Sequence, residues 1–208
     1  MMPNRWESAA ALGALLLATG LAGCRMHVDK NEEGKEKKVQ IDTPFGGVHV
    51  NTDQTTAADL GLPTYPGAIA VKDNDNSSAD VHLGFGPWQL RVRVAKYESP
   101  DAKQKVSDFY KQALGRYGEV LTCQNEKPIG QPTMTSQGLS CASDGKSGHI
   151  NINDKNGKSS LDFGKGIQLK AGSKRHQHVV GFEDPQNGRT RFTLIALDLP
   201  SDNSDKKD

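Results

Sequence analysis

The sequence predicts an α+β fold, in which an antiparallel β-sheet of five or more strands carries one amphipathic helix on one face. Two runs of alternating apolar and polar residues within 81–95 are separated by Gly86-Pro87, which is typical of an antiparallel hairpin. Residues 102–117 instead repeat apolar side chains at helical spacing. The composition, with 35% hydrophobic residues and 22 Gly among 208 residues, favours a loop-rich β protein over a helical bundle.

The N-terminus has the pattern of a secretory signal peptide. Residues 9–22 are apolar or small, Arg5 precedes them, and the run is too short to span a membrane comfortably. Glu7 weakens the positive charge that such a segment usually carries. Because Cys24 follows the small residues Ala22-Gly23, the segment resembles the lipobox of bacterial lipoproteins, whose cysteine is acylated and becomes the new N-terminus. The alternative is an ordinary signal peptide with a coincidental cysteine.

The lipobox resemblance implies a protein anchored to a membrane through Cys24, within the bacterial cell envelope and facing either the periplasm or the surface. Removal of residues 1–23 leaves 208 − 23 = 185 residues, which suits one domain. Two further cysteines remain, Cys123 and Cys141. In an oxidising compartment such a pair predicts a disulfide, whereas the lack of nearby His spacing disfavours a metal site.

The chain divides into five predicted segments. They are a signal peptide over 1–23, a charged flexible tether over 24–38, a β-hairpin and hinge over 39–61, an α+β domain over 62–199 and a disordered tail over 200–208. The tether is predicted because residues 25–38 hold five Lys or Arg, four Asp or Glu and few apolar residues, too few to bury a core.

The hairpin over 81–95 has a register that the sequence itself tests. A two-residue loop at Gly86-Pro87 makes every cross-strand pair on one face apolar, and a slip by one residue would break this agreement. That face is expected to be core, and the other face carries Arg91 and Arg93. The expected pairs are Phe85 with Trp88, Leu83 with Leu90 and Val81 with Val92.

The predicted helix begins at Ser99-Pro100-Asp101, where a serine N-cap, a proline in the first turn and an acidic residue favour a helix N-terminus. Gly118 is a natural C-cap. The apolar stripe is one-sided, so the helix is expected to lie across the sheet. Further strands are predicted over 119–123, 139–142, 149–153 and 167–171, with a last hairpin formed by 175–183 and 189–199.

Several segments resemble a group of uncharacterised exported bacterial lipoproteins. The similar features are PFGGVHV at 44–50, YPGA at 65–68, the Phe-Tyr helix, the first cysteine after that helix, and the end LKAGSKRHQHVV…RTRFTLIALDL. The resemblance covers most of residues 39–199. It implies no activity and no catalytic residue, and its motifs are structural: a turn, a helix face and a disulfide.

Motifs of catalysis are missing from the sequence. No G-x-S-x-G occurs, and the two Gly-Lys-Ser sequences, at 145–147 and 157–159, lack the glycine that a P-loop needs five residues earlier. His176 and His178 share one face of a predicted strand and are weak candidates for metal binding, although the same face suits the rim of the core. No cofactor is expected.

A basic patch is the strongest surface feature of the sequence. It would attract an anionic envelope component, such as a glycan or a lipid head group, or an acidic protein partner. Arg91 and Arg93 are additional candidates for this patch. The alternative to a binding patch is a solvated strand face, on which Lys and Arg protect the strand from edge pairing. The net charge of +1 and the exported location disfavour nucleic acid. The patch residues are Lys165, Lys170, Lys174, Arg175, Arg189 and Arg191.

The sequence therefore leaves two hypotheses for the function. The first is a membrane-anchored lipoprotein that presents a small non-enzymatic binding or structural domain in the envelope. The second is a small exported hydrolase or metal-dependent enzyme without a recognisable motif. An enzyme needs a pocket with convergent polar or titratable groups, whereas a binding module needs only a patch or groove.

Overall fold

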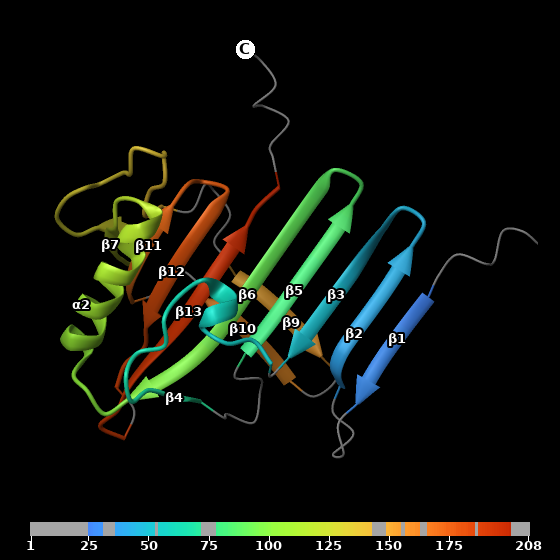
Figure 1. Cartoon of the computed structure of the whole chain (residues 1–208), viewed down its shortest axis with the longest axis horizontal. Helices are drawn as coiled ribbons and strands as arrows, with labels where there is room; N and C mark the ends of the chain where they lie inside the picture. Colours follow the sequence, from blue (N-terminus) through green and yellow to red (C-terminus); the bar gives the residue numbers. More distant parts are fainter. Residues whose placement is uncertain are drawn as a thin grey trace, which may run out of the picture.

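The fold is mainly β. The computed structural model describes residues 25–30, 36–52, 54–71, 78–142, 149–154, 157–162, 166–185 and 187–200. Within these ranges, eleven strands form one antiparallel sheet, and a single α-helix packs on one of its faces (Figure 1). The predicted antiparallel sheet with one helix is therefore present, although the proportion of β structure is larger than expected.

The strands run across the sheet in an order that differs from their order along the chain. From one edge to the other they are β1 (Arg25–Lys30), β2 (Glu36–Thr43), β3 (Gly46–Thr52), β5 (Ser78–Phe85), β6 (Trp88–Ser99), β13 (Thr190–Asp198), β12 (His176–Phe182), β11 (Ile167–Gly172), β7 (Leu121–Gln124) and β8 (Lys127–Pro128). The short strand β4 (Ile69–Ala70) pairs with the last part of β6, and β9 (His149–Asp154) pairs with β10 (Gly157–Asp162) in a separate two-stranded sheet. The helices are η1 (Ala58–Leu60), α2 (Lys103–Leu114) and η2 (Gly115–Tyr117).

The predicted register of the β5–β6 hairpin is confirmed. Phe85 lies opposite Trp88, Leu83 opposite Leu90 and Val81 opposite Val92. The prediction that this whole face is core holds only in part. Val92 is buried, but Phe85 is 49% exposed and Trp88 is 39% exposed at the tip of the hairpin.

Part of the segment predicted as a flexible tether, 24–38, is strand. Residues 25–30 form strand β1, and β2 begins at Glu36. Met26 lies opposite Ile41 and Val28 opposite Val39, so two apolar residues at alternate positions are enough to set a strand register. The predicted hairpin over 39–61 is likewise part of the sheet, because β3 pairs with β5 along its length. Residues 1–24 and 201–208 lie outside the described residues.

The helix begins later than predicted. Strand β6 continues to Ser99, and α2 starts at Lys103 with Ala102 in extended conformation before it. The Ser99 side chain does accept a hydrogen bond from the backbone N–H of Asp101, over 3.1 Å, but this bond closes a turn rather than a helix N-cap. The predicted YPGA turn is confirmed, since Ala68 N–H donates to the Tyr65 carbonyl and Gly67 has a φ of 73°.

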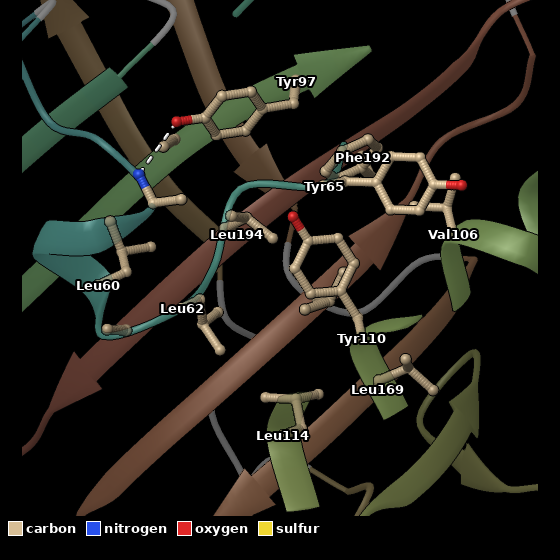
Figure 2. Packing of buried hydrophobic residues seen from close by; sticks show 14 of the residues in the cluster. Leu60, Leu62, Tyr65, Tyr97, Val106, Tyr110, Leu114, Leu169, Phe192 and Leu194 are labelled. Atoms are coloured by element: carbon tan, nitrogen blue, oxygen red, sulfur yellow. Dashed lines mark hydrogen bonds between the residues drawn. The ribbon is translucent and has the colours of Figure 1, made fainter. Parts of the chain in front are cut away.

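One face of the sheet, which we call the helix face, carries the main core. Figure 2 shows the aromatic rings of Tyr65, Tyr97, Tyr110 and Phe192 gathered beneath α2 and the segment that contains η1. Tyr110 and Phe192 are almost fully buried, with ring centroids 5.4 Å apart. Because α2 and η1 cover only the part of the sheet around β6 and β11 to β13, the helix face of β1, β2, β3 and β5 is left open in Figure 1.

Candidate functional site

The predicted disulfide is confirmed. Cys123 on β7 is bonded to Cys141, and both residues are buried in a small cluster with Leu121 and Leu139. The bond ties the long segment after β8 back to the face of the sheet opposite the helix. A covalent link is effective here because the residues between β8 and Cys141 contribute few buried apolar side chains of their own.

Lys170 lies beside this buried cluster and is not part of a basic surface. It lies opposite Leu121 in the sheet, is only 9% exposed, and donates a hydrogen bond from Nζ to the Cys141 carbonyl over 3.1 Å. Burial lowers the pKa of this lysine, although the charge of Glu126 acts in the opposite direction. Its ammonium group is therefore directed away from solvent and from any external anion.

The structure does not bring the other predicted patch residues together. Arg189 and Arg191 both pair with Glu98, at 2.9 and 3.5 Å, near the start of β13. Lys174 and Arg175 are exposed in the turn between β11 and β12, beside the end of β13. About eight residues of extended strand separate these two groups, which corresponds to roughly 26 Å. Lys165 lies outside the described residues.

The two metal candidates, His176 and His178, share one face of β12 as predicted, and this is the helix face, but their environments differ. His176 is exposed, and its Nδ1 lies 2.9 Å from an oxygen of Asp198. His178 stacks on Tyr117 with ring centroids 3.6 Å apart, and burial lowers its pKa. Across the described residues no three His, Cys, Asp or Glu side chains are grouped so that they could hold a metal ion.

A row of polar side chains crosses the helix face, and sequence reasoning missed it. Each member lies directly opposite the next in the strand register, from β1 to β12. With strands about 4.8 Å apart, a row across seven strands extends over roughly 29 Å. We call it the histidine row, and it consists of His27, Gln40, His49, His82, Arg91, Asp198 and His176.

Acidic side chains on the neighbouring positions hold the imidazoles. His27 lies 3.0 Å from Asp29, and His49 lies 3.0 Å from Asp42. The hydrogen bond with His49 is the main cause of a lowered pKa for the Asp42 carboxyl. His82 instead contacts the Gln89 amide oxygen at 2.7 Å.

Arginines on β6 complete the row at its centre. Arg91 donates two hydrogen bonds to the Asp80 carboxylate, over 2.6 and 3.0 Å, and this pairing raises the pKa of the guanidinium group. Arg93 donates to Asp198 over 3.1 Å and to the Asp59 carbonyl of the η1 segment. Burial acts to raise the pKa of Asp198, but the His176 hydrogen bond and the Arg93 charge bring it below its ordinary value.

The row lies on an open surface. The side chains of His27, His49 and His176 are 70%, 44% and 65% exposed. By contrast, a hollow beside Tyr97 and Phe192 has about 160 Å³ of space that includes open solvent, and it holds no enclosed volume in which a small molecule could be buried. Its other lining residues are Val71, Lys96, Glu183 and Arg191.

Comparisons with known proteins add no assignment to this geometry. The chain matches no protein-family model, no curated protein and no solved structure with which we compared it. Within the described ranges, no helix is long and apolar enough to cross a membrane. The resemblance to exported bacterial lipoproteins therefore stays a prediction that rests on the sequence motifs.

Proposed function

We propose that the protein is a membrane-anchored bacterial lipoprotein that presents a non-enzymatic binding domain in the cell envelope. The lipobox at Leu21–Cys24 supports the anchor, and the confirmed disulfide between Cys123 and Cys141 is consistent with an exported protein. The observation that carries the binding role is the histidine row. It offers a broad set of hydrogen-bonding side chains on one open face of the sheet.

The partner that fits this surface is an anionic envelope polymer or an acidic protein. On the helix face around the row, the bases Arg25, Lys38, Arg91 and Arg93 are matched in number by the acids Asp29, Asp42, Asp80 and Asp198. The four imidazoles of the row and the amide of Gln40 add hydrogen-bond donors without adding acidic groups. A carboxylate or phosphate group can accept hydrogen bonds from several of these side chains.

The ion pairs on this surface do not prevent binding. The pairs of His27 with Asp29, His49 with Asp42 and His176 with Asp198 are exposed. Exposed pairs contribute about 0–1 kcal/mol each, so an incoming carboxylate or phosphate competes with these three at little cost. Since the row lies on a regular sheet, its donors stay in fixed positions about one strand apart. A polymer with charges at regular intervals can contact several of them at once, and multivalent contact raises the overall affinity.

Binding to alginate, an acidic polysaccharide, tests this proposal. The purified lipoprotein in detergent is expected to bind immobilised alginate. Replacing His49 and His82 by alanine removes two imidazole donors from the row and is expected to weaken binding roughly tenfold, at about 0.7 kcal/mol for each lost contact. Dissociation constants from biolayer interferometry would measure the effect.

A matched variant separates the row from general electrostatics. Lys103→Ala with Lys127→Ala also removes two hydrogen-bond donors, one on α2 and one on β8, away from the row. This variant is expected to bind within about twofold of the unchanged protein, a difference below 0.5 kcal/mol. Unchanged binding by the His49 and His82 double variant, or equal weakening in the two double variants, would contradict a binding role for the histidine row.

A further inference from the structure

One end of the sheet carries four of the seven large hydrophobic side chains that are exposed among the described residues. Arg25 at the start of β1 lies opposite Asp42, and the register continues through Gly47 and Gly84 to Gln89. The β2–β3 turn and the β5–β6 turn therefore project from the end at which β1 begins. Figure 1 shows both turns and the beginning of β1 on the same side of the molecule, and we call this side the β1 end.

The two turns at the β1 end carry aromatic residues and no charge. Phe45, in the β2–β3 turn, is 85% exposed, and the rings of Phe85 and Trp88, on either side of the β5–β6 turn, lie 5.9 Å apart. Met26, the second residue of β1, is 71% exposed. Large apolar side chains clustered on a surface mark an interaction site, and aromatic rings are favoured at the boundary between lipid and water.

Basic side chains lie at the same end. The Leu199 N–H donates to the Arg175 carbonyl over 2.8 Å, so the β11–β12 turn continues beyond the pair of His176 and Asp198. Strand β6 extends in the same direction from Arg91 to Trp88, so the β11–β12 turn lies at the β1 end. Lys174 and Arg175 are both exposed there. A basic residue close to an anionic lipid surface contributes about 1 kcal/mol to binding.

The chain enters the sheet at this end as well. Cys24 immediately precedes Arg25, the first residue of β1, in the sequence. An acyl group on that cysteine would hold β1 at the lipid surface with almost no spacer, because strand β1 begins at the next residue. The anchor, the two aromatic turns and the basic turn would then all meet the same plane.

We propose that the β1 end of the sheet lies directly on the lipid bilayer, with Phe45, Phe85 and Trp88 in the head-group region and Lys174 and Arg175 against anionic lipid. This orientation rests on the proposed lipid anchor at Cys24. It places the histidine row, three residues along β6 from Trp88, about 10 Å from Trp88 along the strand and therefore close to the head groups. The binding surface would thus stand at the membrane rather than extend away from it.

Trp88 is a built-in reporter of this contact. The chain has two tryptophans, and Trp6 lies within residues 1–23, so the mature lipoprotein retains only Trp88. The lipidated protein would be reconstituted into vesicles of equal parts phosphatidylethanolamine and phosphatidylglycerol, with and without brominated acyl chains. Trp88 emission is expected to shift to the blue and to fall roughly twofold with brominated lipid, because an interfacial tryptophan lies near the acyl chains.

A second placement of the same fluorophore is the control. Ile69 on β4 is 54% exposed and lies opposite Glu98, ten residues along β6 from Trp88. The variant Trp88→Phe with Ile69→Trp moves the reporter about 33 Å away from the β1 end. Its emission is expected to be equal in the two kinds of vesicle.

Flotation of the same vesicles separates the two proposals. If the protein floats with the vesicles but Trp88 is not quenched, the orientation is overturned and the lipid anchor stands. If the lipobox protein does not float, the anchor and the orientation both fall. Equal quenching from positions 88 and 69 would also overturn the orientation, because the domain would then have no preferred end toward the lipid.

Discussion

Replacing Phe192 by alanine is expected to lower the free energy of unfolding by about 3–5 kcal/mol. The Phe192 ring is 1% exposed, and its centroid lies 5.4 Å from that of Tyr110, 5.9 Å from Tyr97 and 6.5 Å from Tyr65. One side chain on β13 thus joins α2, β6 and the YPGA turn. Its removal leaves a cavity that three rigid aromatic rings refill poorly. Urea denaturation followed by circular dichroism measures the loss.

Phe45→Ala is the matched control for this prediction. It makes the same chemical change at a ring that is 85% exposed in the β2–β3 turn, so the expected change in the free energy of unfolding is within about 0.5 kcal/mol. If the two variants were destabilised equally, Phe192 would not be at the centre of the core and the packing of α2 on the sheet would have to be revised.

Removing the disulfide by Cys123→Ala with Cys141→Ala is expected to cost about 3 kcal/mol. The bond closes a loop between positions that are 18 apart, and its loss increases the conformational entropy of the unfolded chain. Lys170 adds to the effect, because its ammonium group donates to the Cys141 carbonyl and would lose that acceptor when the segment loosens. The midpoint of thermal unfolding would measure the change.

Reduction of the unchanged protein provides the control for the alanine substitutions. A thiol reductant is expected to lower the midpoint of the unchanged protein and to leave that of the double alanine variant unaffected. A midpoint that does not respond to reductant in the unchanged protein would show that the Cys123–Cys141 bond contributes nothing to stability.

Local patterns predicted the parts of this fold that depend on neighbouring residues. The alternation on both sides of Gly86-Pro87 is enough to fix the register of β5 and β6, because a two-residue loop leaves only one arrangement with all apolar pairs on one face. The apolar stripe of α2 likewise needs only the helical repeat, and Tyr110 and Leu114 from that stripe are fully buried.

The histidine row could not be predicted in the same way. His27, His82 and His176 are far apart in the sequence and come together only through the spatial order of seven strands. Composition also concealed β1, since Met26 and Val28 are the apolar residues of a highly charged segment. The prediction that the six basic residues form one patch was wrong for a related reason. Sequence alone shows neither that Lys170 points into the disulfide cluster nor that Glu98 lies beside Arg189.

The lipid anchor at Cys24 is the central claim, since both the envelope function and the orientation on the membrane depend on it. Mass spectrometry of the intact protein from the membrane fraction of its bacterial host tests it directly. We expect a chain that begins at Cys24 and carries acyl groups, and a Cys24→Ser variant that lacks them and leaves the membrane fraction. A chain that retains residues 1–23, or that has an unmodified Cys24, would contradict the account.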